Sequence, residues 1–181
     1  MVLGDSLSAG FGLDQGDGWV SMLQRRLQDK SYDYRVVNAS ISGDTTSGAL
    51  ARVDRELERV RPEVVIVELG GNDGLRGLSL SQMQRNLAAI IDKIRSRGAR
   101  VLLTGMQLPP NYGPAYTQAF QRVYRRLATE KKVALVPFLL EGIAQDRANF
   151  QPDGIHPTAA AQGRILDNVW QELEPLLRGQ T

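Results

Sequence analysis

Two short segments at opposite ends of the chain hold residue types that could perform nucleophilic chemistry. Near the amino terminus, Ser6 follows the apolar run Met1–Leu3 and the pair Gly4 and Asp5. Near the carboxyl terminus stands His156, the only histidine in the sequence. A serine hydroxyl is inert at its own pKa and becomes a nucleophile only when an adjacent base takes its proton. We therefore expect the fold to bring these two segments together.

Transfer of an acyl group to a serine needs further groups, and the sequence offers a candidate for each. Asp153 stands three residues before His156 and can accept the second ring N–H, which fixes the reactive tautomer. The negative oxygen of a tetrahedral intermediate needs donors that already point at it. The candidate oxyanion-hole donors are the backbone N–H groups of Ser6 and Gly43 and the side-chain amide of Asn72.

Alternating apolar and amphipathic segments must position these residues. Continuous apolar runs predict buried parallel strands, and apolar spacings of three and four predict helices between them. This alternation predicts the α/β class, as a three-layer α/β/α sandwich with a five-stranded parallel sheet, flavodoxin-like, in a single domain 1–181. The predicted strands are 1–3, 35–38, 64–69, 101–104 and 133–136, and the predicted helices are 19–30, 47–60, 79–97, 114–132, 139–145 and 157–177.

The candidate residues all follow predicted strands. Ser6 follows the first strand, Gly43 the second and Asn72 the third, and His156 follows the fifth after a loop. The carboxyl ends of parallel strands meet at one edge of the sheet, where open α/β sheets bind their ligands. Four separate segments that converge on this edge indicate an active site more strongly than any one of them alone.

Four blocks of the sequence resemble those of the SGNH (GDSL) hydrolases, a family named for its Ser, Gly, Asn and His. The blocks are Gly4–Ser8, Gly43, Gly70–Asp73 and Asp153–His156, in this order along the whole chain. The segment Leu108–Gly113 is similar to the bacterial multifunctional thioesterase I/lysophospholipase/arylesterase branch. The resemblance implies a Ser-His-Asp esterase and thioesterase that cleaves aryl and alkyl esters, fatty acyl thioesters and lysophospholipids. It implies neither a cofactor nor a metal.

Apolar loop residues near the predicted site are candidates for binding the acyl or aryl group of a small-molecule substrate. For several of them, packing of the loops is an equally open role. The candidate substrate-binding residues are Leu75, Leu78, Leu108, Pro109, Tyr112 and Ile155.

Composition limits the partners and the location of the chain. No apolar stretch approaches the ~20 residues of a membrane helix, and the absence of cysteine excludes disulfides and thiolate metal sites. The net charge is +2 and the basic pairs are scattered, which favours a solvated surface over a nucleic-acid interface. We expect a monomer. Only three residues precede Gly4, which is short for a first strand, so we expect that upstream residues such as a signal peptide were removed or omitted. The resembling branch is usually exported, which implies a periplasmic location, with the cytoplasm also open.

Other classes of protein remain to be compared with this interpretation. A classical α/β-hydrolase carries glycine two residues on either side of its serine, whereas position 8 here is Ser8. A metal-dependent hydrolase is hard to build with one histidine and no cysteine. A non-catalytic flavodoxin-like binding module and an acyltransferase with the same triad both stay open. Asp5 and Asp73 are interpreted as organisers of their turns rather than as catalytic groups.

Overall fold

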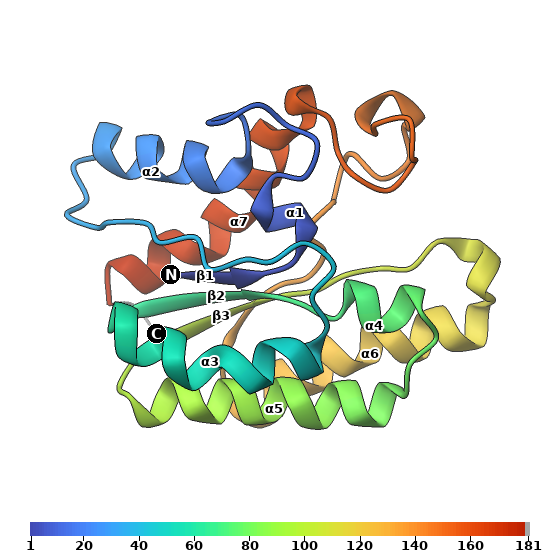
Figure 1. Cartoon of the computed structure of the whole chain (residues 1–181), viewed down its shortest axis with the longest axis horizontal. Helices are drawn as coiled ribbons and strands as arrows, with labels where there is room; N and C mark the ends of the chain where they lie inside the picture. Colours follow the sequence, from blue (N-terminus) through green and yellow to red (C-terminus); the bar gives the residue numbers. More distant parts are fainter. Residues whose placement is uncertain (180–181) are drawn as a thin grey trace.

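The structure, a computed structural model, describes residues 1–179 as a parallel sheet between two layers of helices (Figure 1). Its strands are β1 (Val2–Gly4), β2 (Val64–Glu68), β3 (Arg100–Thr104) and β4 (Ala134–Val136). Its α-helices are α1 (Ser6–Ala9), α2 (Trp19–Asp29), α3 (Thr46–Val60), α4 (Gly71–Leu75), α5 (Leu80–Ser96), α6 (Pro114–Lys131) and α7 (Gln162–Leu177). The 3-10 helices are η1 (Pro110–Tyr112), η2 (Arg147–Asn149) and η3 (Ala159–Ala161).

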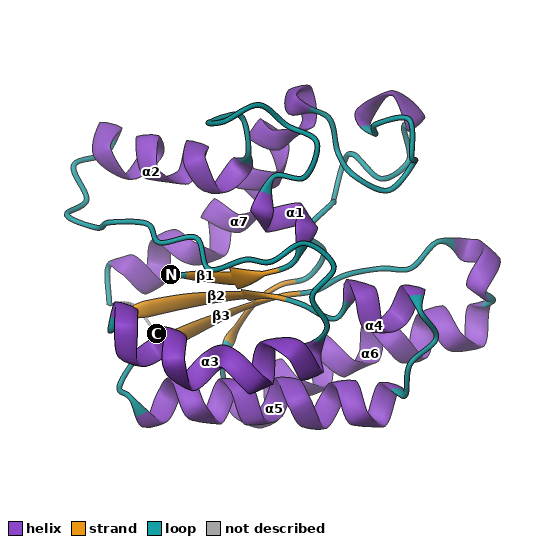
Figure 2. Ribbon diagram, viewed as in Figure 1, coloured by secondary structure: helices purple, strands orange, loops and turns teal. Residues whose placement is uncertain are grey.

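The sheet lies in the middle of the molecule, and its strands run in the order β1-β2-β3-β4. Helices α2 and α7 cover one face, and α3, α5 and α6 cover the other (Figure 2). All residues of β1 and β2 are buried, as the apolar runs predicted. Burial of one large aliphatic side chain contributes about 1.5–3 kcal/mol, so the two-sided sheet is the main source of stability. Helix α5 presents a fully buried stripe made of Met83, Leu87, Ile90, Ile91 and Ile94.

Helix starts follow local chemistry that is visible in the sequence. The hydroxyl of Thr45 accepts a hydrogen bond from the N–H of Gly48 and caps α3. The hydroxyl of Ser79 accepts one from the N–H of Gln82 and caps α5 in the same way. Such caps satisfy backbone donors that the first helical turn leaves without partners. Helix α6 begins at Pro114, whose missing N–H costs nothing at this position.

The sheet has four strands, so the prediction of five was wrong in one element. The segment predicted as a strand over 35–38 forms only a single bridge, between Asn38 and Val2. The N–H of Val36 is bound by the side chain of Gln24 at 2.7 Å instead of joining a ladder. The segment still lies beside β1, because Val2 exchanges hydrogen bonds with the backbone at positions 37 and 39, each 2.8 Å long.

The predicted helix over 139–145 is absent, and this segment forms consecutive turns. Gly142 has φ +80°, a left-handed backbone conformation that interrupts a right-handed helix. The apolar spacing that suggested a helix serves burial instead, because Leu139, Leu140 and Ile143 all lie in the core.

The carboxyl ends of β1 and β2 lead directly into α1 and α4, which lie at the same end of the sheet (Figure 1). The two strands pair in parallel with Gly4 opposite Glu68. This register places the turn at Ser6 close to the turn at Asn72. None of the helices in residues 1–179 combines the length and apolarity that a membrane span requires.

Candidate active site

Ser6 is the first residue of α1, directly after the turn that ends β1. Asp5 caps this helix, because its Oδ1 accepts a hydrogen bond of 3.0 Å from the N–H of Leu7. Within residues 1–179 no acceptor binds the N–H of Ser6. An unpaired donor at a helix start carries partial positive charge and can receive a negative oxygen.

A continuous chain of hydrogen bonds joins the serine, the histidine and the aspartate. The Oγ of Ser6 lies 2.8 Å from Nε2 of His156, and Nδ1 of His156 lies 2.7 Å from Oδ2 of Asp153. The other carboxylate oxygen of Asp153 accepts from the N–H groups of Ile155 and His156. The hydrogen bond from the His156 ring, with these two backbone bonds, lowers the pKa of Asp153 to about 2. Asp153 is therefore an anion at neutral pH and can hold the imidazole in one tautomer.

The histidine loop is fastened to the loop that follows α1. The ring of Phe11 packs on the ring of His156 with 4.4 Å between the two centroids. The Nε2 of Gln151 donates to the carbonyl of Phe11 at 2.8 Å, and its backbone N–H donates to the carbonyl of His156 at 2.8 Å. Gln151 thereby connects the segment that carries the serine with the segment that carries the histidine.

Gly43 and Asn72 approach the same turn from a further loop and from the start of α4. Gly43 has φ +79°, and no acceptor within residues 1–179 binds its N–H. Arg76 donates to the Gly43 carbonyl at 2.9 Å and holds that peptide. The Nδ2 of Asn72 donates to Oδ2 of Asp5 and to the carbonyl of Asp44, each at 3.0 Å. Both amide hydrogens of Asn72 thus have partners, so a bound oxyanion would share or replace one of these bonds.

Asp73 organises its loop, as the sequence analysis predicted. Its carboxylate accepts from the backbone N–H of Thr46 at 2.9 Å and from the Thr46 hydroxyl at 2.5 Å. The same hydroxyl accepts from Asn86 at 3.0 Å. These bonds tie the start of α3 to α4 and α5, and so they support the loop at Gly43 and the position of Asn72 on α4.

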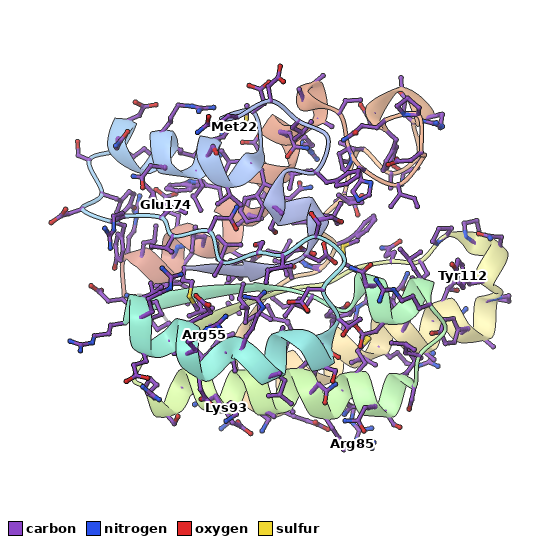
Figure 3. The ribbon with its side chains drawn as sticks, in the orientation of Figure 1. Met22, Arg55, Arg85, Lys93, Tyr112 and Glu174 are labelled. Atoms are coloured by element: carbon purple, nitrogen blue, oxygen red, sulfur yellow. The ribbon has the colours of Figure 1, made fainter. Side chains whose placement is uncertain are left out.

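The six candidate substrate-binding residues fall into two groups. Leu108 is buried against Gly74 and belongs to the core. The hydroxyl of Tyr112 donates to the carbonyl of Leu75 at 2.8 Å, so these two residues fasten the η1 loop, which Figure 3 shows beyond α4. The other three are exposed and free to meet a ligand: Leu78, Pro109 and Ile155.

The sequence analysis missed one charged residue next to the serine. Glu68, the last residue of β2, has no exposed surface, and its Oε2 accepts from the N–H of Asp5 and from the hydroxyl of Ser8. Burial, followed by the nearby Asp5 carboxylate, raises the pKa of Glu68 well above its ordinary value. The signal was present, because a carboxylate that ends a continuous apolar strand is unusual. No group of three or more metal-binding side chains gathers in residues 1–179.

Comparison with known proteins agrees with this geometry. Residues 2–164 match the model of the GDSL-like lipase/acylhydrolase family. The chain belongs to this family. The resemblance seen in the four sequence blocks is thereby confirmed.

Relatives of the chain cover almost its full length. It is 58% identical to Esterase TesA of Pseudomonas aeruginosa over 98% of this chain and 88% of that protein. It is 42% identical to Thioesterase 1/protease 1/lysophospholipase L1 of Escherichia coli K12, over 98% and 84%. The crystal structure of the psychrotrophic esterase EstA from Pseudoalteromonas sp., inhibited by monoethylphosphonate, superposes with a TM-score of 0.93. That structure is 39% identical and covers 98% of this chain and 97% of its own, which confirms the SGNH hydrolase fold.

Proposed function

We propose that Ser6, His156 and Asp153 are the catalytic triad of this enzyme. The protein is a serine hydrolase of carboxylic ester and thioester bonds, the reaction class of its family and of its named relatives. One observation carries the assignment of residues: the unbroken hydrogen-bond chain from Ser6 Oγ through both nitrogens of His156 to Asp153. A serine, a base and a group that orients the base form the constellation needed for an activated nucleophile.

The triad would act in two steps. The Oγ of Ser6 attacks the acyl carbon while its proton moves to Nε2 of His156, and the carbonyl electron pair becomes an oxyanion. The oxyanion collapses, the bond to the leaving oxygen or sulfur breaks, and His156 protonates that group. Water then attacks the acyl-serine with His156 again as base, and the acid leaves as Ser6 is restored. Asp153 remains an anion throughout and stabilises the imidazolium.

Three donors would stabilise the oxyanion: the N–H groups of Ser6 and Gly43 and the side-chain amide of Asn72. The two backbone donors have no acceptor within the described chain, which supports their assignment. Donors fixed before the reaction stabilise developing charge without reorganisation.

The substrates we propose are aryl and alkyl esters, fatty acyl thioesters and lysophospholipids. The exposed large apolar side chains of the described residues are Phe11, Ile41, Leu78 and Ile155. Each of them lies on a segment that also carries a site residue, and this supports an acyl group as the ligand. The names of the relatives, esterase and thioesterase/lysophospholipase, agree with this range.

We also propose that the domain 1–181 acts as a periplasmic monomer without a nucleic-acid partner. The scattered basic residues and the resemblance to an exported branch support this assignment. Fractionation of cells and light scattering of the purified protein test it.

The test of the triad compares wild type, Ser6→Ala and a matched control, Ser21→Ala, whose side chain is exposed on α2. We expect hydrolysis of p-nitrophenyl esters from acetate to palmitate by wild type and control, and a loss of at least about 1,000-fold in Ser6→Ala. A p-nitrophenyl alkylphosphonate should add its phosphonyl group to Ser6 alone, seen by mass spectrometry of peptides. Equal activity in wild type and Ser6→Ala would overturn the proposal.

A further inference from the structure

Glu68 is a buried acid that the proposed mechanism does not use. It ends β2 opposite Gly4 and is 0% exposed, which is rare for an ionisable side chain. Four residues later in the chain comes Asn72, and two positions beyond Gly4 comes Ser6. A polar group placed between two site turns must have partners, because burial without them is costly.

The contacts of Glu68 lie on both sides of the serine. Its Oε2 accepts from the N–H of Asp5 at 3.2 Å and from the hydroxyl of Ser8 at 2.7 Å. These groups belong to the residue before Ser6 and to the residue two after it, so one carboxyl oxygen holds both ends of the turn. The contact exists only because Gly4 has no side chain: a Cβ there would lie 2.8 Å from this oxygen.

The second oxygen of Glu68, Oε1, is buried and finds no hydrogen-bond partner among the described residues. The charge of the Asp5 carboxylate, which lies nearby, adds to the effect of burial and raises the pKa of Glu68 further. Asp5 uses its two carboxyl oxygens to cap α1 and to receive the amide of Asn72.

The titratable groups around Glu68 offer it no permanent cation. Tyr124 reaches in from α6 and donates to the carbonyl of Leu69, and burial raises its pKa, so it stays neutral. Asp73 on α4 is a further acid, and the cation that acts on Asp5 is His156, and only when it is protonated. Burial first, and then the charge of Asp5, raises the pKa of Glu68 well above its ordinary value.

We propose that Glu68 is a buried positioning residue that bonds both sides of the Ser6 turn and, through Asp5, orients the amide of Asn72. This inference rests on the roles proposed for Ser6 and Asn72. It predicts that the amide of glutamine can replace Glu68, because it offers one acceptor and one donor group in nearly the same shape. It also predicts that a side chain of equal length without oxygens cannot.

The kinetic test compares Glu68→Gln with Glu68→Met, and with Glu58→Gln as a control for the same change on the exposed face of α3. We expect kcat within about threefold of wild type for Glu68→Gln, and a fall of about 10- to 100-fold with little change in KM for Glu68→Met. The rate of phosphonylation of Ser6 should follow kcat. A glutamine variant as impaired as the methionine variant, or a methionine variant with wild-type kcat, would overturn the proposal.

A second variant keeps the proposal testable if Glu68→Met fails to fold. Ser8→Ala removes one hydrogen bond to Oε2 and leaves the core intact. We expect its kcat to fall about three- to tenfold at unchanged KM, in line with one lost hydrogen bond. An unchanged kcat would contradict a positioning role. Ser6→Ala, assayed beside these variants, tests the triad independently, so failure of the two proposals can be distinguished.

The dependence of stability on pH reports on the ionisation of Glu68, which activity measurements do not. The raised pKa means that folded Glu68 keeps a proton that the unfolded chain releases above about pH 4.5. The contribution of Glu68 to the free energy of unfolding is therefore fully present below about pH 4.5. It declines as the pH rises through the folded-state pKa of Glu68. We expect wild type to lose stability relative to Glu68→Gln as the pH rises above about 4.5, measured by urea unfolding. Parallel curves for the two proteins would show that the pKa of Glu68 is not raised in the folded state.

Discussion

The site has a serine half, formed by Ser6 and the residues behind it, and a histidine half, formed by His156 and its loop. The two halves are held in place by different kinds of contact. The serine half is held from within by contacts between residues 63 positions apart, and Glu68 and Asp5 behind it are 0% and 3% exposed. The histidine half is held mainly by local contacts near the surface: Asp153 bonds His156 three residues away, and the Asp153 side chain is 36% exposed. The nucleophile is thus fixed by the core, whereas the base is fixed by its own loop and by one link from Gln151 to Phe11.

This difference predicts that substitutions in the two halves affect stability and activity differently. Changes in the serine half should lower both, because buried partners are left unpaired. Changes in the histidine half should lower activity alone, because water replaces what is lost.

The largest effect should come from the histidine half. His156→Ala removes the proposed base, so we expect kcat/KM for p-nitrophenyl butyrate to fall about 10,000-fold or more. The midpoint of thermal unfolding should stay within about 2 °C of wild type, because the His156 ring contacts Ser6, Asp153 and the exposed ring of Phe11, none of which belongs to the apolar core. Calorimetry measures the midpoint. A drop above about 5 °C would show that the loop contributes to global stability and would break the comparison.

Asn72→Ala should come next, from the serine half. The loss of one oxyanion donor is worth about 2.7–4 kcal/mol, so we expect kcat to fall about 100- to 1,000-fold. Stability should fall as well, because Oδ2 of Asp5 and the carbonyl of Asp44 lose their donor. Kinetics and urea unfolding of the same preparation test both expectations. A variant within about threefold of wild-type kcat would remove Asn72 from the mechanism.

The smallest effect should come from the link between the halves. Gln151→Ala deletes the side-chain bonds to the carbonyls of Phe11 and Pro157, and the backbone bond to His156 remains. We expect kcat to fall about three- to tenfold, since the base is less well held over Ser6. Asn111→Ala, an exposed loop change of similar size, is the control. If Gln151→Ala matches this control in kcat, the two loops are aligned without the link.

The sequence was sufficient for the long elements and for the family to which the four blocks belong. Helices α2, α3, α5, α6 and α7 and strands β2, β3 and β4 had been expected within a few residues of their observed bounds, because amphipathic spacing and caps act locally. The distances that join Ser6, His156 and Asp153 follow the expected convergence at the carboxyl edge.

The errors arose where tertiary contacts overrule local pattern. The side chain of Gln24 accepts a hydrogen bond from the N–H of Val36, so the expected second strand does not form a ladder. The positive φ of Gly142 interrupts the helix expected over 139–145. Helices α1 and α4 were missed, since elements of four and five residues carry too little periodicity. Leu108 had been considered for substrate binding but packs in the core, and Glu68 was correctly placed in a strand but not recognised as a neighbour of the site. Its partners became visible only in three dimensions.

The pairing of Gly4 with Glu68 also limits how this protein can be diversified. Any side chain at position 4 would collide with both Glu68 and Ser8, since its first carbon would stand 2.8 Å from each. A mutational library that varies position 4 alone should therefore yield almost no active clones. Libraries that vary positions 4, 8 and 68 together can recover them, and natural sequences that depart from glycine at position 4 should covary at the other two. Positions 4, 8 and 68 are therefore expected to change together or not at all.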